Sequence, residues 1–136
     1  MFGEKIRLSV VTPDRKVVDE DVDEVVLPGD LGYFGVLPGH APYLVRLHAG
    51  EADYRSGRSH QYLAIGGGFA EVLPDRVTVL ADSAERPGEI RLEEAESEVA
   101  RAEEGMRTAP PEEQDAARAR LAHARIRVEV ALRAAE

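Results

Sequence analysis

Residues 32–42 read G-Y-F-G-V-L-P-G-H-A-P, with three glycines and two prolines around the apolar pair Val36 and Leu37. Glycine permits positive φ and close backbone approach, whereas proline fixes φ and cannot continue a central strand. Most loops are polar and mobile, so a loop that is constrained and partly apolar has another role. The stretch predicts a shaped loop that acts as a packing or docking surface. A long β-hairpin connection is the alternative interpretation.

Residues 5 to about 82, on both sides of this stretch, have the pattern of short strands. Ile6, Leu8 and Val10 alternate with Arg7 and Ser9, which is the period of a half-buried strand. Further strands are expected at 16–22, 24–27, 43–48, 51–54, 60–65, 69–73 and 76–81. Turns are expected between them, including Ala49-Gly50 and the glycine run 66–68, for which a bulge or close strand crossing is also considered. This pattern predicts an all-β sandwich, or flattened antiparallel barrel, over residues 1–86.

The sequence period changes after Arg86-Pro87-Gly88, so residues 87–136 are expected to form a second unit. Apolar residues recur there at intervals of three and four, and Pro110-Pro111 interrupts the pattern. The two stripes predict an antiparallel α-helical hairpin with a seam of Leu92, Ala95, Val99, Ala102 and Met106 against Ala117, Leu121, Ala124, Val128, Ala131 and Ala135. Because alanine buries little area, we expect the seam to be weak and the hairpin to be separable from the surface on which it rests.

The second predicted helix has a basic character, and Ile126 and Val130 widen its apolar face. Its arginines are Arg118, Arg120, Arg125, Arg127 and Arg133, whereas the first helix is rich in glutamate. One interpretation is that these are ordinary solvated faces with interhelical ion pairs, each worth well under about 1 kcal/mol. The other is that the arginine row binds an acidic surface of another protein.

Composition excludes several classes of function. The 136 residues carry a formal net charge of −9, so binding to nucleic acid or directly to anionic lipid is disfavoured. The chain has no cysteine, hence no disulfide framework. We see no signal or transit peptide and no apolar run of transmembrane length. The expectation is a protein of the cytosol, or one that reaches a membrane only through a partner.

No catalytic constellation is found in the sequence. His40, His48, His60 and His123 are scattered and have no metal-binding spacing. The glycine run 66–68 is not followed by a lysine and a helix, which argues against a phosphate-binding loop. We therefore expect no enzymatic activity, no cofactor and no metal.

Three runs of sequence carry a resemblance to a known family. They are V-V-T-P-D-R at 10–15, L-P-G-D-L-G-Y-F-G-V-L-P-G-H-A-P at 27–42 and G-G-G-F-A-E-V-L-P-D-R-V-T-V-L-A-D-S-A-E-R at 66–86. In motif, order and spacing the chain resembles the epsilon subunit of bacterial rotary (F-type) ATP synthases, and the two-helix tail agrees.

The resemblance implies a non-catalytic central-stalk rotor subunit of a proton-translocating ATP synthase. The sandwich is then expected to bind the gamma subunit and the ring of c subunits, and the hairpin to inhibit ATP hydrolysis when it extends to the catalytic alpha/beta head. It implies a peripheral protein on the cytoplasmic side of the bacterial plasma membrane. The residues expected to face the c-ring and gamma are Asp30, Gly32, Tyr33, Phe34, Gly35, Val36, Leu37, Gly39 and His40. Those expected at the catalytic head are Arg118, Arg120, Arg125 and Arg127.

One motif of the family is degraded. Several bacterial members bind ATP through I-D-x-x-R-A, and the matching positions here are Ile90, Arg91, Glu94 and Ala95. A carboxylate repels a triphosphate that an arginine would bind, so weak ATP binding or none is expected, although Arg101 could keep a residual contact. Two alternatives stay open: a nucleotide-sensing module that binds ATP at the hairpin, and a stand-alone small-molecule-binding sandwich with a helical dimerisation tail.

Overall fold

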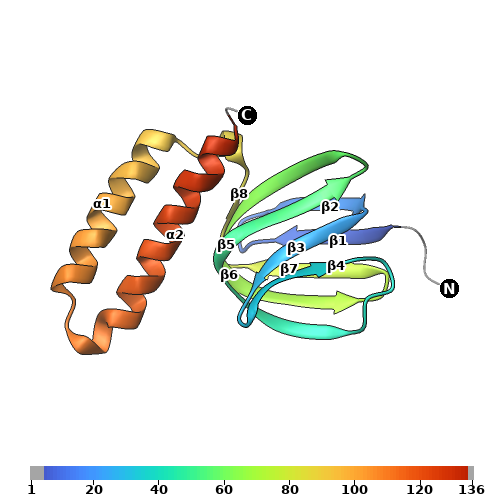
Figure 1. Cartoon of the computed structure of the whole chain (residues 1–136), viewed down its shortest axis with the longest axis horizontal. Coiled ribbons are helices and arrows are strands. Elements are labelled where there is room, and N and C mark those ends of the chain that lie inside the picture. The colour runs from blue at the N-terminus through green and yellow to red at the C-terminus, as the bar shows by residue number, and fades with distance from the viewer. Residues whose placement is uncertain (1–4, 135–136) are drawn as a thin grey trace.

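The computed structural model describes residues 5–134 and consists of a β-sandwich with a helical hairpin packed on one side (Figure 1). The described elements are β1 (Ile6–Val11), β2 (Lys16–Val22), β3 (Glu24–Gly29), β4 (Gly32–Val36), β5 (Tyr43–Ser56), β6 (Ser59–Leu73), β7 (Arg76–Ala81), β8 (Ala84–Glu85), the 3₁₀ turn η1 (Pro87–Glu89), α1 (Leu92–Thr108), η2 (Pro111–Glu113) and α2 (Gln114–Arg133). The predicted fold, a sandwich followed by an antiparallel hairpin, is confirmed.

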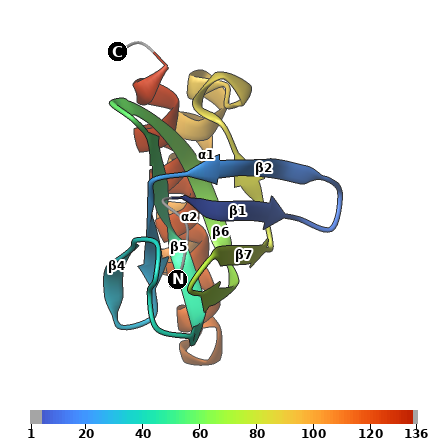
Figure 2. The same ribbon diagram turned by 90° about the vertical axis from the view of Figure 1, so that its right-hand side faces the viewer.

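The strands form one sheet that folds over on itself. Its order is β2-β1-β7-β6-β5-β3-β4, and β8 pairs with β6. Only β1 and β7 are parallel among the described pairs; the others are antiparallel. The two longest strands, β5 with 14 residues and β6 with 15, curve sharply next to the helices and run through both layers (Figures 1 and 2).

The curve in β5 and β6 reverses which alternate residues face the core. In β5 the inward residues are Val45 and Leu47 before the curve, then Ala52 and Tyr54 after it. Gly67 and Gly68 of β6 lie at the curve with φ of 109° and 133°. A Cβ on Gly68 would lie 2.1 Å from the carbonyl oxygen of Leu80. Glycine is thus required at 68 both for its backbone angles and for the close approach of β6 to the β7 backbone.

A single apolar core fills the space between the layers. Every layer contributes to it through the period-2 alternation of its strands. Its fully buried large side chains are Ile6, Leu8, Val10, Val22, Val25, Leu27, Val36, Tyr54, Leu63, Ile65, Val72 and Val77. Among the described residues, none with a polar or charged side chain is classed as buried apart from Tyr54, whose hydroxyl accepts a hydrogen bond from Arg86 at 2.9 Å.

The hairpin contacts the sandwich mainly through α2, which lies between α1 and the strands (Figure 1). A second, small apolar cluster joins the two units and consists of Ala64, Ile90, Ala95, Val130 and Ala131. The predicted seam residues of α1 and α2 are buried or half-buried, except that Ala135 lies outside the described residues. Val130, expected only to widen the apolar face, is fully buried against the sandwich.

Three predictions about local structure are wrong. Residues 43–48 and 51–54 belong to one strand, as do 60–65 and 69–73, because Ala49-Gly50 and the glycine run 66–68 bend the strands without ending them. Instead of the bulge or close strand crossing considered for 66–68, β6 keeps its register with β5 there and lies close beside β7 at Gly68. Residues 32–36, expected in a loop, form β4 and pair with β3. Pairing with a neighbouring strand, which the local sequence does not encode, decided each case.

The bend in β6 gives a direct prediction about stability. We expect Gly68→Ala to lower the free energy of unfolding by at least about 2 kcal/mol, since alanine would adopt a strained φ and its Cβ would collide with the Leu80 carbonyl. Urea unfolding of the full chain, followed by far-UV circular dichroism, measures the change.

Gly105→Ala in α1 is the matched control. A Cβ there meets no atom within 4 Å, and alanine favours a helix interior over glycine by about 0.5–1 kcal/mol. This variant should be slightly more stable than the parent. A Gly68→Ala chain with the parent's urea midpoint would show that the bend tolerates a side chain.

Candidate partner-binding surfaces

The turn between β3 and β4 projects an apolar tip from the sandwich. Leu31 is 94% exposed and Tyr33 is 59% exposed, whereas Leu37, 53% exposed, follows the far end of β4. Gly32 makes the tight turn possible with a φ of 124°. An isolated leucine is not informative, but a fully exposed leucine on a rigid two-strand turn, close to other apolar side chains, is suited to docking.

The other predicted tip residues have more varied positions. Val36 is fully buried in the core, and Phe34 packs against the core and edge-to-face on Tyr43, with ring centroids 5.5 Å apart. These two side chains hold the tip on the sandwich. Asp30 pairs with His48 at 2.9 Å.

Hydrogen bonds fix Tyr33 near the turn, and Gly39 and His40 beyond the far end of β4. The Tyr33 hydroxyl accepts a hydrogen bond from the Glu51 amide at 3.1 Å, and the Gly39 amide donates to the carbonyl of Pro74 at 2.7 Å. The His40 amide donates to the carbonyl of Leu37 at 3.1 Å. Gly35 lies in β4 opposite Val26. Residues 32–42 therefore form a shaped surface that runs from the β3–β4 turn past the far end of β4, as their glycines and prolines predicted, although half of them are strand.

A second apolar surface, which the sequence reading missed, lies on the outer face of β5, β6 and β7. Leu44, Phe69 and Leu80 are 72%, 49% and 58% exposed, and we call these three side chains with Arg46 the β5–β7 patch. Phe69 is paired with Arg46 in β5 and with Leu80 in β7, so three neighbouring strands contribute to one surface. The Arg46 guanidinium carbon lies 5.6 Å from the centre of the Phe69 ring.

A signal for this patch was present in the sequence. Strands with one solvated face alternate apolar and polar residues, and Leu44, Phe69 and Leu80 occupy outward positions where polar residues are usual. The signal could be used only with the correct strand limits, because a shift by one residue exchanges the two faces.

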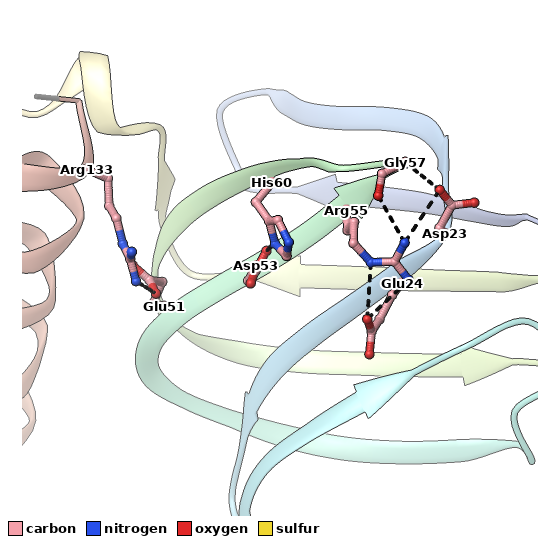
Figure 3. Close-up of polar contacts among 8 residues, drawn as sticks. All are labelled: Asp23, Glu24, Glu51, Asp53, Arg55, Gly57, His60 and Arg133. Atoms are coloured by element: carbon pink, nitrogen blue, oxygen red, sulfur yellow. Dashed lines mark hydrogen bonds and ion pairs between the residues drawn. The ribbon is translucent and has the colours of Figure 1, made fainter. Parts of the chain in front are cut away.

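Two arginines of α2 fasten the hairpin to the sandwich. Arg127 donates two hydrogen bonds to Glu85, at 2.8 and 3.1 Å, and Arg133 donates two to Glu51, at 3.0 and 2.9 Å. Figure 3 shows Arg133 reaching from the helix to Glu51 on β5. The Arg133 guanidinium also stacks on Tyr62, 4.1 Å from the ring centre. We call these two bidentate pairs the clasps.

The Arg127 clasp is the more buried of the two, since only 16% of the Arg127 side chain is exposed. Its hydrogen bond to Glu85 raises the pKa of Arg127 above its usual value. Bidentate arginine–carboxylate pairs are among the strongest polar contacts in proteins. Arg127 is therefore engaged in holding the hairpin on the sandwich and is not a freely solvated member of the arginine row.

The other members of the predicted arginine row lie at the surface. Arg118 pairs with Asp115 at 2.8 Å within α2, and Arg125 reaches Glu103 of α1 at 3.7 Å. Arg120 lines a shallow hollow between the helices. These exposed groups fit the interpretation as solvated faces with ion pairs, and they are also accessible to a partner.

The degraded nucleotide motif does not form one site. Ile90 and Ala95 are buried in the small cluster between hairpin and sandwich. Arg91 lies 4.0 Å from Glu94, and both are largely exposed at the start of α1. Arg101 pairs with Glu98 at 3.4 Å and lines a different hollow. A cation and a carboxylate that neutralise each other leave little net charge for a triphosphate.

The segment between sandwich and hairpin is tied to the strands. The two terminal nitrogens of Arg86 donate to the Tyr54 hydroxyl at 2.9 Å and to the Val17 carbonyl at 3.0 Å. Glu89 pairs with Arg15 at 2.7 Å. Hydrogen bonds from Arg15 and from the Arg86 amide lower the pKa of Glu89 to about 2. Residues up to Glu89 therefore belong physically with the sandwich.

Within residues 5–134 there is no group of three or more histidine, aspartate or glutamate side chains placed to hold a metal ion. The helices of the same part of the chain are too short or too polar to span a membrane.

Comparison with known proteins identifies what the chain is similar to. Residues 5–87 match the family model described as the ATP synthase, Delta/Epsilon chain, beta-sandwich domain. The ATP synthase epsilon chain of Geotalea uraniireducens is 45% identical over 136 residues, covering 98% of this chain and 99% of the relative. That of Syntrophobacter fumaroxidans is 53% identical over 102 residues, covering 75% of this chain and 76% of the relative.

Solved structures with the same fold come from mitochondrial ATP synthases. A chain in the Euglena gracilis OSCP/F1/c-ring structure superposes with a TM-score of 0.83 at 22% identity, covering 97% of this chain and 84% of that one. A chain of the Tetrahymena thermophila central stalk/c-ring structure superposes with a TM-score of 0.64 at 14% identity, covering 95% of this chain and 98% of that one. At these identities the likeness concerns the fold.

The clasps lead to a prediction about hairpin docking. Arg127→Ala should destabilise the docked α2 by about 1–2 kcal/mol, because it removes two charge-assisted hydrogen bonds and leaves Glu85 without them. Amide hydrogen exchange of α2 in the full chain, compared with the parent, measures the loss of protection.

Arg118→Ala is the control, because its pair with Asp115 is exposed and local to the helix. Protection of α2 should not change in that variant. The double variant Arg127→Ala with Glu85→Gln should cost less than the sum of the two single changes. Additive losses would mean that the interaction between Arg127 and Glu85 does not stabilise the docked hairpin.

Proposed function

Because the chain belongs to the family of ATP synthase epsilon chains, we propose that it is a non-catalytic central-stalk rotor subunit of a bacterial proton-translocating ATP synthase. In this role it couples the gamma subunit to the ring of c subunits and inhibits ATP hydrolysis through its C-terminal hairpin. It is peripheral, on the cytoplasmic side of the plasma membrane, and meets the membrane only through the complex.

The observation that carries the proposal is the β5–β7 patch. Leucine and phenylalanine side chains on the outer face of three paired strands leave apolar area in water, which a protein partner can cover. In β5 and β6, which also carry the hairpin, the patch lies on the opposite side of the curve from the hairpin contacts. We assign this surface to the gamma subunit, with Phe69 at its centre and Arg46 beside it, since aromatic and arginine side chains dominate binding energy in interfaces.

The β3–β4 tip is assigned to the c-ring. Leu31 is the most exposed large apolar side chain of the described residues, and Phe34 and Val36 hold the turn on the core. A rigid apolar tip keeps the conformational cost of docking low, because little has to be ordered on binding. The two surfaces together would allow one small sandwich to contact both rotor components at once.

Inhibition is assigned to the released hairpin. The cluster between hairpin and sandwich contains three alanines among its five buried residues, so apolar contacts hold α2 only weakly and the clasps contribute much of the rest. Such a unit can detach while the sandwich stays folded. Arg118, Arg120 and Arg125 are exposed already and suit an acidic segment of the alpha/beta head, whereas Arg127 would first have to leave Glu85.

The alternative of a nucleotide-sensing module has little support. Arg91 and Glu94 stand where the family's motif has acid and arginine, they face each other, and Arg101 lies at another hollow. We keep the proposal of weak ATP binding or none. A stand-alone small-molecule-binding sandwich has no support either, since the interior of the sandwich is filled by side chains.

The gamma interface can be tested by charge substitution. Phe69→Asp and Leu80→Asp should each weaken binding to the gamma subunit at least about thirtyfold, because a carboxylate would be desolvated in an apolar contact. Binding of the purified chain to gamma, measured by calorimetry, gives the affinity. Unchanged affinity in both variants would remove the patch from the interface.

Leu132→Asp is the matched control, since Leu132 is half exposed, as Phe69 is, but lies on α2. It should bind gamma as the parent does. Circular dichroism should show the same β content in all three variants, because outward positions contribute little to the core.

The inhibitory role can be tested in the parent complex. Replacing Arg118, Arg120 and Arg125 together by alanine should raise the rate of ATP hydrolysis, and more at low salt, where charge pairing is less screened. Arg107→Ala in α1 is the control for losing an exposed arginine that pairs only with Glu104 of its own helix. A hydrolysis rate equal to the parent's, with normal assembly, would mean that these three arginines form an ordinary solvated face and do not bind the catalytic head.

A further inference from the structure

His123 lies at the contact between α2 and the sandwich, between the two structural units. Its Nε2 is 3.3 Å from the Oγ of Ser83, which follows β7. It is half-buried, as His40 is, whereas His48 and His60 are exposed on the sandwich. Among the histidines, only His123 belongs to the hairpin.

The ring fits closely against the curved strand β6. A Cβ added to Gly66 would lie 2.2 Å from the Ser83 Oγ and 3.1 Å from the His123 Nε2. The glycine therefore makes room for this contact. Because α2 carries the ring, detachment of α2 takes it away from Gly66 and Ser83 and hydrates it fully.

Charged groups of both signs surround His123. On α2, Arg120 and Arg127 lie three residues before and four residues after it, about one helical turn away on each side. From α1, Glu98 and Arg101 line the same hollow with Arg120. From the strands come Glu85 in β8, bound to Arg127, and Asp82 next to Ser83.

We propose that protonation of His123 weakens the docking of α2 on the sandwich, so that the hairpin detaches more readily as the pH falls. The inference needs no partner subunit and goes beyond the proposed function, because it concerns a contact within this chain. In an assembled complex, acidification would then favour the extended state of the hairpin and the effect of that state.

The sign follows from the surroundings. Burial of the ring lowers the pKa of His123, Arg127 lowers it further, and Glu85 and Glu98 partly oppose the shift. In the detached hairpin the ring is hydrated and its pKa returns toward about 6.5. The detached state therefore binds the proton more tightly. Docking is unaffected above about pH 6.5 and weakens as the pH falls from there through the lower pKa of the docked state.

The hydrogen bond to Ser83 does not offset this effect. A hydroxyl group can donate to a neutral ring nitrogen or accept from a protonated one, so the contact is available in both states. The cost of the charged state is the loss of water around the ring and the nearness of Arg127. A single proton can change the docking equilibrium by at most about tenfold per pH unit.

The experiment uses the full chain, which contains no cysteine. Asp14→Cys in the β1–β2 turn and Glu112→Cys at the hairpin tip are both exposed and accept a donor and an acceptor dye. Energy transfer between them is measured from pH 7.5 to 5.5. We expect the transfer efficiency to change as the pH falls, no more steeply than the titration of one proton allows. In the same doubly labelled chain carrying His123→Gln, the transfer efficiency should stay constant.

His60→Gln is the control, because His60 pairs with Asp53 on the sandwich (Figure 3) and does not line the hollow around His123. It should follow the parent. Constant transfer in the parent, or the same pH dependence in the His123→Gln chain, would overturn the proposal.

A second measurement covers the case in which His123→Gln is detached at every pH. The ring proton shifts of His123 in the otherwise unchanged chain, followed by NMR through the same range, give its pKa directly. A value below that of a histidine in a short model peptide is expected. A value equal to or above it would overturn the proposal whatever the variant does.

Discussion

The close approach of β6 to its neighbour β7 at Gly68 is the constraint on which the rest of the structure depends. Only a residue without a Cβ fits beside the Leu80 carbonyl, and only glycine readily adopts φ of 133° there. The curve lets one strand pair run through both layers. Its outer face carries the hairpin on one side of the curve, at Glu51, Tyr62 and Ala64, and the β5–β7 patch on the other.

Two kinds of interaction hold the two units. The sandwich is stabilised by a large, continuous apolar core, whereas the hairpin rests on a few small apolar side chains and two arginine–glutamate clasps. Each buried CH₂ is worth about 0.8 kcal/mol, so alanine contacts add little compared with leucine or isoleucine. The clasps depend on geometry and charge, which makes the docked state sensitive to salt and, near His123, to protons. Stability is therefore divided unequally along the chain.

The segment where the sequence period changes is bound to the sandwich. Arg86 and Glu89 are bound to Tyr54, Val17 and Arg15 of the sandwich. The low pKa of Glu89, about 2, means that its pair with Arg15 persists well into acid and weakens only as the pH falls from about 4.5 toward 2. Any movement of the hairpin that leaves this anchor intact must begin after Glu89.

The sequence by itself determined the class of each unit, because hydrophobic period is a local property. Alternation at Ile6, Leu8 and Val10 required a half-buried strand, and spacing by three and four required helices that meet along an alanine seam. It also indicated, through its glycines and prolines, that residues 32–42 form a shaped surface. The family motifs then pointed to the same fold.

Tertiary structure alone decided three features. These are where the strands continue through glycines, which outward residues form one apolar patch, and which arginines pair with carboxylates of the sandwich. Glycines 66–68 are turn-formers by local preference, yet pairing on both sides of β6 keeps them in the strand. Leu44, Phe69 and Leu80 are far apart in sequence and become one patch only through strand register. Arg127 and Arg118 have the same chemistry on the same helix, but only Arg127 faces a sandwich carboxylate. Contacts between distant residues set these outcomes, and a single chain's local pattern does not contain them.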